Sequence, residues 1–137
     1  MQPWRGTHQE THIDLAGNMK QVTRGNHDIN SFTFAGGKIV ANMNTISKAV
    51  ELYDVNLESG ELKQLTDVNR EIYDHIKFGE VQERWITTTD GKKMLTWVIL
   101  PPDFDPTKKY PTLLYCQGGP QSTVSQFWSY RWNFQLM

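Results

Sequence analysis

The chain has 137 residues, with 14 Lys and Arg against 15 Asp and Glu, so its formal charge is −1. One domain is the default for a chain of this length, and a near-zero charge gives no basic surface for nucleic acid or an acidic membrane. No apolar run approaches the ~20 residues of a membrane-spanning helix. The single cysteine, Cys116, excludes an internal disulfide and a cysteine-rich zinc site.

The first half of the chain is patterned as β-hairpins, and helical periodicity is hard to find before residue 120. A Gly36-Gly37 pair between two apolar runs favours a type I′ turn, because this turn needs positive φ at both central residues. We expect strands at 10–15, 19–22, 29–34, 38–43, 51–55 and 61–65.

An internal repeat links two of these hairpins. His12-Ile13-Asp14-Leu15 followed by residues 19–23 resembles Leu52-Tyr53-Asp54-Val55 followed by residues 62–66, with offsets of 40 at the Asp and 43 at the Lys-Gln-apolar-Thr end. A period of about 40–45 with four strands per unit is typical of a β-propeller blade. The alternative is two unrelated hairpins that share Asp and Thr by chance.

The propeller interpretation gives about one and a half blades. The runs from 29 to 65 make one four-stranded blade, and residues 10–23 supply the last two strands of the blade before it. Since a propeller needs roughly 4–8 blades to close, we expect the chain to be a piece of a longer protein. The isolated chain should then expose unpaired strand edges and self-associate.

The second half has a different pattern. Residues 72–78 lead into a hairpin of 81–88 and 94–100 around Asp90-Gly91, a strong hairpin signal. The continuous apolar run at 112–116 favours a strand buried on both faces, and we expect the Cys116 thiol to be buried with it. Aromatic residues between 127 and 137 are loosely spaced like a helix face.

Residues 109–122 read Lys-Tyr-Pro-Thr-Leu-Leu-Tyr-Cys-Gln-Gly-Gly-Pro-Gln-Ser. This stretch resembles the oxyanion strand and loop of the prolyl oligopeptidase family, serine peptidases in which a β-propeller precedes an α/β-hydrolase domain. Residues 88–91, Trp97, Pro101-Pro102 and Phe104 resemble the hairpin that opens the hydrolase domain, and residues 52–55 with 65–66 resemble the closing strands of the last blade. The resemblance implies a mostly β fragment, in which residues 1–70 are the C-terminal part of a β-propeller. Residues 71–137 are then a linker and the first strands of an α/β-hydrolase domain.

The Gly-Gly-Pro loop has a chemical role that acyl transfer requires. Negative charge develops on the carbonyl oxygen, and one N–H donor aimed at it is worth about 10²–10³ in rate. By resemblance, Gln117 and Gly118 belong to this oxyanion loop, and Gly119 contacts substrate. The family usually has His or Tyr where this chain has Gln117; the Gln amide could donate to the oxyanion, or it could be a strand-end residue with only backbone groups donating.

The catalytic nucleophile is not found in the sequence. No Gly-x-Ser-x-Gly occurs, and Ser122, Ser125 and Ser129 are interpreted as helix-cap or surface serines. In α/β-hydrolases the Ser, Asp and His of the triad follow in that order, so all three are expected beyond Met137. This chain alone is therefore expected to be inactive.

Other candidate residues carry weaker signals. Arg131 could pair with a substrate carbonyl or carboxylate, and the neighbouring Trp128, Tyr130 and Trp132 either line the substrate entrance or pack the first hydrolase helix. His8, Glu10 and His12 alternate along a strand, but they lack the spacing of a metal motif and are interpreted as a solvated face. We expect no metal and no cofactor.

The sequence thus predicts part of a serine exopeptidase of the dipeptidyl or acylaminoacyl peptidase type, acting on short peptides. Two alternatives stay open: a non-catalytic propeller binding module and an esterase that uses the same oxyanion chemistry. The resemblance favours a periplasmic location, while the P1 preference cannot be read from these residues.

Overall fold

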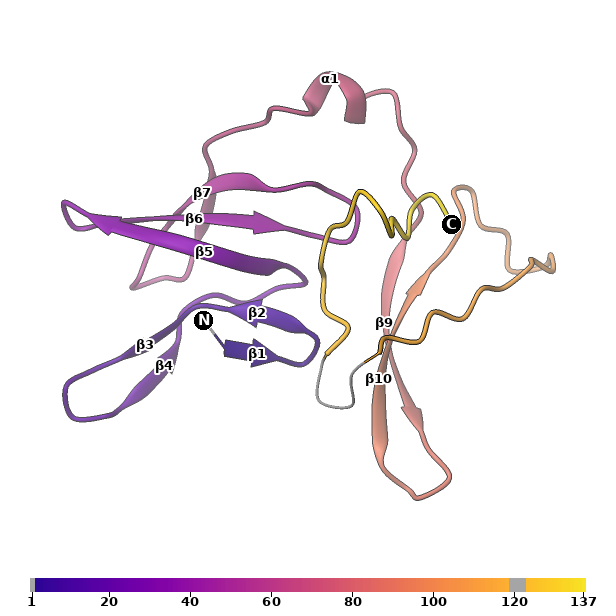
Figure 1. The fold of residues 1–137 in the computed structure, drawn as a ribbon, viewed down its shortest axis with the longest axis horizontal. Coiled ribbons are helices and arrows are strands. Elements are labelled where there is room, and N and C mark those ends of the chain that lie inside the picture. The colour runs from indigo at the N-terminus through magenta and orange to yellow at the C-terminus, as the bar shows by residue number, and fades with distance from the viewer. Residues whose placement is uncertain (1, 119–122) are drawn as a thin grey trace.

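The structure, a computed structural model, describes residues 2–118 and 123–137. It is built mostly from short strands (Figure 1). The elements are β1 (Gln2–Trp4), β2 (Thr7–Gln9), β3 (Thr11–Ile13), β4 (Met19–Gln21), β5 (Asp28–Ala35), β6 (Lys38–Asn44), β7 (Glu51–Val55), β8 (Leu62–Gln64), α1 (Arg70–Tyr73), β9 (Val81–Thr87) and β10 (Lys93–Ile99).

The main sheet has six strands in the order β1-β2-β5-β6-β7-β8. Strands β5 to β8 pair antiparallel in chain order, which confirms the four strands predicted between residues 29 and 65. The β1–β2 hairpin, which the sequence pattern did not reveal, joins the edge of β5 through a parallel pairing of His8 with Asp28. The β3–β4 hairpin forms a separate two-stranded sheet.

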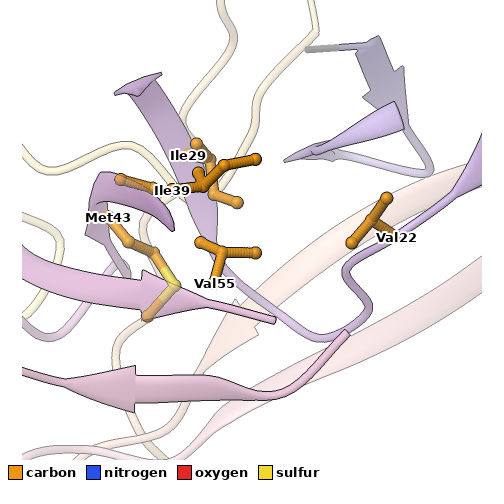
Figure 2. Close-up of a cluster of buried hydrophobic side chains, with 6 residues drawn as sticks. Val22, Ile29, Ile39, Met43 and Val55 are labelled. Atoms are coloured by element: carbon orange, nitrogen blue, oxygen red, sulfur yellow. The ribbon is translucent and has the colours of Figure 1, made fainter. Parts of the chain in front are cut away.

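Alternation along β6 creates the core. Ile39, Ala41 and Met43 are buried on one face of this strand, as a half-buried strand with period two requires. The turn before β6 has φ of 56° at Gly36 and 77° at Gly37, so both glycines have the positive φ that the type I′ prediction required. Figure 2 shows Ile39 and Met43 of β6 lying near Ile29 and Val55, with Val22 on a separate segment to one side. The buried cluster comprises Val22, Ile29, Ile39, Ala41, Met43 and Val55.

The structure supports the internal repeat and corrects its alignment. His12 pairs with Lys20 in the first hairpin as Asp54 pairs with Lys63 in the second. The equivalent of Asp14 is therefore Asn56, and not Asp54 as the sequence comparison suggested. Both side chains accept backbone N–H groups of their own turn: Asp14 from Ala16 and Asn18, and Asn56 from Glu58 and Ser59.

The hairpin predicted around Asp90-Gly91 is confirmed as β9 and β10, paired in unbroken register from Lys93↔Thr87 to Ile99↔Val81. Between the main sheet and this hairpin no helix is predicted from the sequence pattern, yet residues 70–73 form the single turn α1. Among the described residues no helix is long and apolar enough to cross a membrane.

Three predictions for the last part of the chain are wrong. Residues 112–116 form no strand, Leu114 is 85% exposed, and the Cys116 thiol is exposed as well. An apolar run becomes a buried strand only beside hydrogen-bonded neighbours, and all strands in the described part of the chain pair with one another. Residues 127–137 form bends and a turn instead of a helix, and the rings of Trp132 and Phe134 pack on Tyr115.

Candidate oxyanion loop and its supports

The side chain of Gln117 is oriented by a tyrosine two residues earlier. The Tyr115 hydroxyl donates a hydrogen bond of 2.8 Å to Gln117 Oε1. Since the carboxamide oxygen is used as an acceptor, its Nε2 is the atom that can donate to a substrate oxygen. The arrangement suits the donor role considered for Gln117.

An aromatic cluster, defined as Tyr115, Phe127, Trp132 and Phe134, holds the tyrosine. The ring centroids of Tyr115 and Phe134 lie 5.0 Å apart, nearly edge to face, and those of Phe127 and Phe134 lie 5.3 Å apart. Edge-to-face pairs of this kind are stabilising. The chain therefore returns after the loop and packs against the residue that orients Gln117.

The remaining predicted loop residues have different outcomes. Gly118 is exposed, and a Cβ added to it would meet nothing within 4 Å. Gly119 lies outside the described residues. Arg131 is exposed, and its guanidinium lies over the Trp132 ring at 5.3 Å, so the structure attaches it to the edge of the aromatic cluster. Trp128 packs edge to face on Tyr130 at 5.9 Å.

Ser125 is not the surface serine that the sequence suggested. Its hydroxyl is buried and donates to Asp28 Oδ2 at 2.5 Å, while Asp28 Oδ1 accepts from the His8 backbone N–H at 2.9 Å and lies 3.1 Å from His8 Nδ1. In a catalytic triad the imidazole lies between serine and acid. Here the carboxylate lies between them, so these three residues form a structural junction.

Ser129 caps a turn and not the helix that the sequence suggested. Its hydroxyl accepts the backbone N–H groups of Arg131 at 3.1 Å and of Trp132 at 2.9 Å, which stabilises the turn beneath the aromatic cluster. Ser122 lies outside the described residues. No sequence signal marked Asp28 and Ser125 as partners, because 97 positions separate them.

The His8, Glu10 and His12 series does not form one face. His8 belongs to β2, His12 is exposed on β3, and Glu10 between the two strands is buried. Within residues 2–118 and 123–137, no group of three His, Cys, Asp or Glu side chains could hold a metal ion. The interpretation as a solvated face is therefore wrong for Glu10, whose carboxylate is held inside.

Two buried titratable groups have shifted pKa values. Burial raises the pKa of the Glu10 carboxyl above its ordinary value, and Glu10 Oε1 has no hydrogen-bond partner among the described residues. Burial lowers the pKa of the His27 imidazole, an effect that the neighbouring Asp28 charge partly offsets. Glu10 directly follows β2 and His27 directly precedes β5, so neither belongs to the loop that carries Gln117.

Comparison with known proteins gives consistent relatives. The chain is 48% identical over 121 residues to dipeptidyl-peptidase 5 of Porphyromonas gingivalis, which is 88% of this chain and 18% of that protein. It is 42% identical over 119 residues to dipeptidyl-peptidase 5 of Porphyromonas endodontalis, covering 87% of this chain and 17% of the relative. No protein-family model matches.

The fold has solved counterparts. Acylaminoacyl peptidase of Pyrococcus horikoshii matches 96% of this chain with a TM-score of 0.78 and 25% identity, over 20% of its own length. A structure of acylaminoacyl peptidase with a chloromethyl ketone bound matches with a TM-score of 0.79.

These matches define a peptidase-related chain that is mostly β. More particularly, the similarity to dipeptidyl-peptidase 5 and acylaminoacyl peptidase supports the prolyl oligopeptidase family, of which this chain represents a segment. It spans about a fifth of the length of these relatives.

Proposed function

We propose that the chain is the part of a serine peptidase that joins the end of a β-propeller, residues 1–70, to the start of an α/β-hydrolase domain, residues 71–137. The observation that carries the proposal is the 48% identity to a dipeptidyl-peptidase over 88% of the chain. The antiparallel series β5 to β8 and the repeated hairpin before it support the assignment of the first part to a propeller.

The proposed reaction is hydrolysis of short peptides, of the dipeptidyl or acylaminoacyl type, through an acyl-enzyme. A serine hydroxyl adds to the peptide carbonyl carbon, the amine leaves with the transferred proton, and water then releases the acyl group. The triad is supplied by sequence outside this chain. The chain's own contribution is the stabilisation of the carbonyl oxygen as it becomes negative.

In this proposal Gln117 Nε2 donates to that oxygen together with the backbone at Gly118. Support comes from the hydrogen bond between the Tyr115 hydroxyl and Gln117 Oε1, which fixes which end of the amide faces away from the tyrosine. Because Gly118 has no Cβ, the substrate can approach its backbone closely. Gly119 and Arg131 are the proposed substrate contacts.

The test is fluorophosphonate labelling of the full-length peptidase that carries this segment, with the 137-residue chain as the control. Labelling of the full-length protein alone is expected, because the nucleophile is proposed to lie outside these residues. Chromogenic dipeptide, acylaminoacyl and simple ester substrates then separate the peptidase from an esterase. Labelling of neither protein would contradict the proposal and favour a non-catalytic module.

A further inference from the structure

The strongest unassigned feature is a set of buried polar contacts where residues 125–126 meet the main sheet. The Asn44 Nδ2 group donates to the Gln126 backbone carbonyl at 2.7 Å, and the Ile46 backbone N–H donates to Gln126 Oε1 at 3.2 Å. Beside them Ser125 donates to Asp28. Gln126 is only 2% exposed, so these bonds form where water cannot replace them.

All of these contacts converge on one end of the β5–β6 ladder. Asp28 begins β5, Asn44 ends β6, and the two residues are direct partners in the sheet register. Asn44 Oδ1 also accepts a hydrogen bond of 2.7 Å from Asn30 Nδ2, which fixes the orientation of its amide. The sheet therefore presents an ordered polar end to Ser125 and Gln126.

The same segment is held a second time, ten residues later. Gln135 Oε1 accepts the Gly79 backbone N–H at 2.8 Å, and Gln135 Nε2 donates to the Gly79 carbonyl at 3.0 Å and to Ser47 Oγ at 2.7 Å. Figure 1 shows the yellow C-terminal segment running between the main sheet and the β9–β10 hairpin. Residues 125–135 are thus tied at both ends.

We propose that Gln126 is a positioning residue, which clamps the segment after Gln117–Gly118 to the ends of β5 and β6 and so fixes that loop relative to the main sheet. The inference rests on the proposed function for its catalytic consequence. Gln126 follows Gly118 by only eight positions, and its segment carries the aromatic cluster that packs on Tyr115. Loss of the clamp should loosen the aromatic cluster, and with it Tyr115, whose hydroxyl orients Gln117.

If Gln126 had a purely structural role, its loss would lower the stability of the whole protein and would not affect the Gln117–Gly118 loop selectively. Two variants of the full-length peptidase remove the clamp by different chemistry. Gln126→Met keeps the side-chain length and loses the acceptor for Ile46 N–H. Asn44→Asp keeps the oxygen that accepts from Asn30 and loses the donor to the Gln126 carbonyl. Gln9→Met is the matched control, because it makes the same change at another glutamine that is 2% exposed and that bonds to Thr7, Gly25 and Thr23.

The readouts are kcat and KM on a dipeptide substrate, together with hydrogen–deuterium exchange. A displaced catalytic group costs up to about 10²-fold in rate, so we expect both clamp variants to lose about tenfold or more in kcat with KM changed less than twofold. Exchange should quicken selectively in peptides spanning 43–48 and 112–118. Gln9→Met should leave kcat and the exchange of 112–118 unchanged.

The outcomes separate the two proposals. Unchanged kcat and unchanged exchange at 112–118 in an active peptidase would overturn the clamp and leave the peptidase assignment standing. Uniformly faster exchange across the whole protein, or global unfolding of Gln126→Met, would also overturn it, since either result indicates a general contribution to stability. If the full-length protein hydrolyses nothing, selective exchange at 112–118 in both variants still supports the clamp and only the peptidase proposal fails.

Discussion

Thr23 and Thr66 occupy the same position in two successive hairpins. The Thr23 hydroxyl donates to Gln9 Oε1 at 2.8 Å and accepts the Glu10 N–H at 3.0 Å. The Thr66 hydroxyl donates to the Glu51 carboxylate and accepts the Leu52 N–H at 2.9 Å. In both repeats, a threonine after the second strand of the hairpin thus hydrogen-bonds to two consecutive residues, Gln9–Glu10 or Glu51–Leu52, near the start of the first strand.

Replacement of either threonine by valine should therefore destabilise the chain. Thr23→Val and Thr66→Val keep the side-chain shape and leave two hydrogen-bonding groups without their partner, which costs about 1–3 kcal/mol. Urea denaturation of the 137-residue chain measures the free energy of unfolding. Thr33→Val, at an exposed position on β5, is the control and should change it little. An equal effect at all three positions would refute the shared role.

Gly60 should tolerate no side chain. Its φ is 74°, and a Cβ would lie 2.1 Å from the Val22 carbonyl oxygen, because the β7–β8 turn abuts the preceding hairpin. Gly36 has a similar φ of 56° with nothing within 4 Å, so Gly36→Ala measures the backbone strain alone, about 1–2 kcal/mol. We expect Gly60→Ala to cost a further ~1–3 kcal/mol from overpacking. Equal losses in urea denaturation would show that the turn moves away freely.

The parts of the fold that sequence predicts are those set by neighbouring residues. Gly36-Gly37 and Asp90-Gly91 dictate their hairpins, because turn chemistry acts within a few positions. The repeat was recognisable, but its alignment was shifted since Asp14 matches Asp54 in residue type while its turn role belongs to Asn56. Residue identity alone did not separate a strand position from a turn position.

The contacts that hold the candidate loop could not be predicted from the sequence. The Gly-Gly-Pro pattern pointed to Gln117, but the bond from Tyr115 depends on the backbone between them, and the clamp at Gln126 joins residues 80 or more positions apart. The run at 112–116 was predicted as a strand from its composition. Strand formation depends on neighbouring strands as well as composition, and this run pairs with none in the described ranges.

Glu10 should make stability decrease as pH rises. Burial raises the pKa of this carboxyl in the folded chain, so above the unfolded value the folded state binds more protons than the unfolded state and the free energy of unfolding falls until pH passes the folded pKa. Glu10→Gln removes this loss. Its free energy of unfolding should therefore exceed that of the parent by more at pH 7 than at pH 4. Urea denaturation at both pH values measures the difference. The exposed Glu61→Gln should show no such dependence.

His27 should act in the opposite direction. Burial lowers the pKa of its imidazole, and His27 Nε2 has no partner in the described part of the chain. As pH falls through the unfolded value near 6.5, the unfolded chain takes up the proton first and the free energy of unfolding decreases. His27→Gln should remove this acid-side loss between pH 7 and pH 5. His75→Gln, at an exposed position, serves as the control; a parallel change in both variants would exclude burial as the cause.

Loss of the Gln117 amide should lower kcat more than loss of the Tyr115 hydroxyl, because only Gln117 is proposed to donate to the reacting oxygen. In the full-length peptidase, Gln117→Leu removes the proposed donor and should lower kcat about 10²–10³-fold. Tyr115→Phe keeps the ring contact with Phe134 at 5.0 Å and loses only the 2.8 Å bond to Gln117 Oε1. We expect a smaller loss, about tenfold, because the amide remains present but is less well oriented.

Tyr110→Phe is the matched control for this pair. The Tyr110 hydroxyl accepts the Asp105 N–H at 3.0 Å in a separate loop, and its ring packs on Phe104 at 5.2 Å, so the same chemical change falls away from Gln117. Its kcat should stay within twofold of the parent value. Equal kcat values for Tyr110→Phe and Tyr115→Phe would show that the tyrosine does not orient the amide, and an unaffected Gln117→Leu would show that backbone groups alone stabilise the oxyanion.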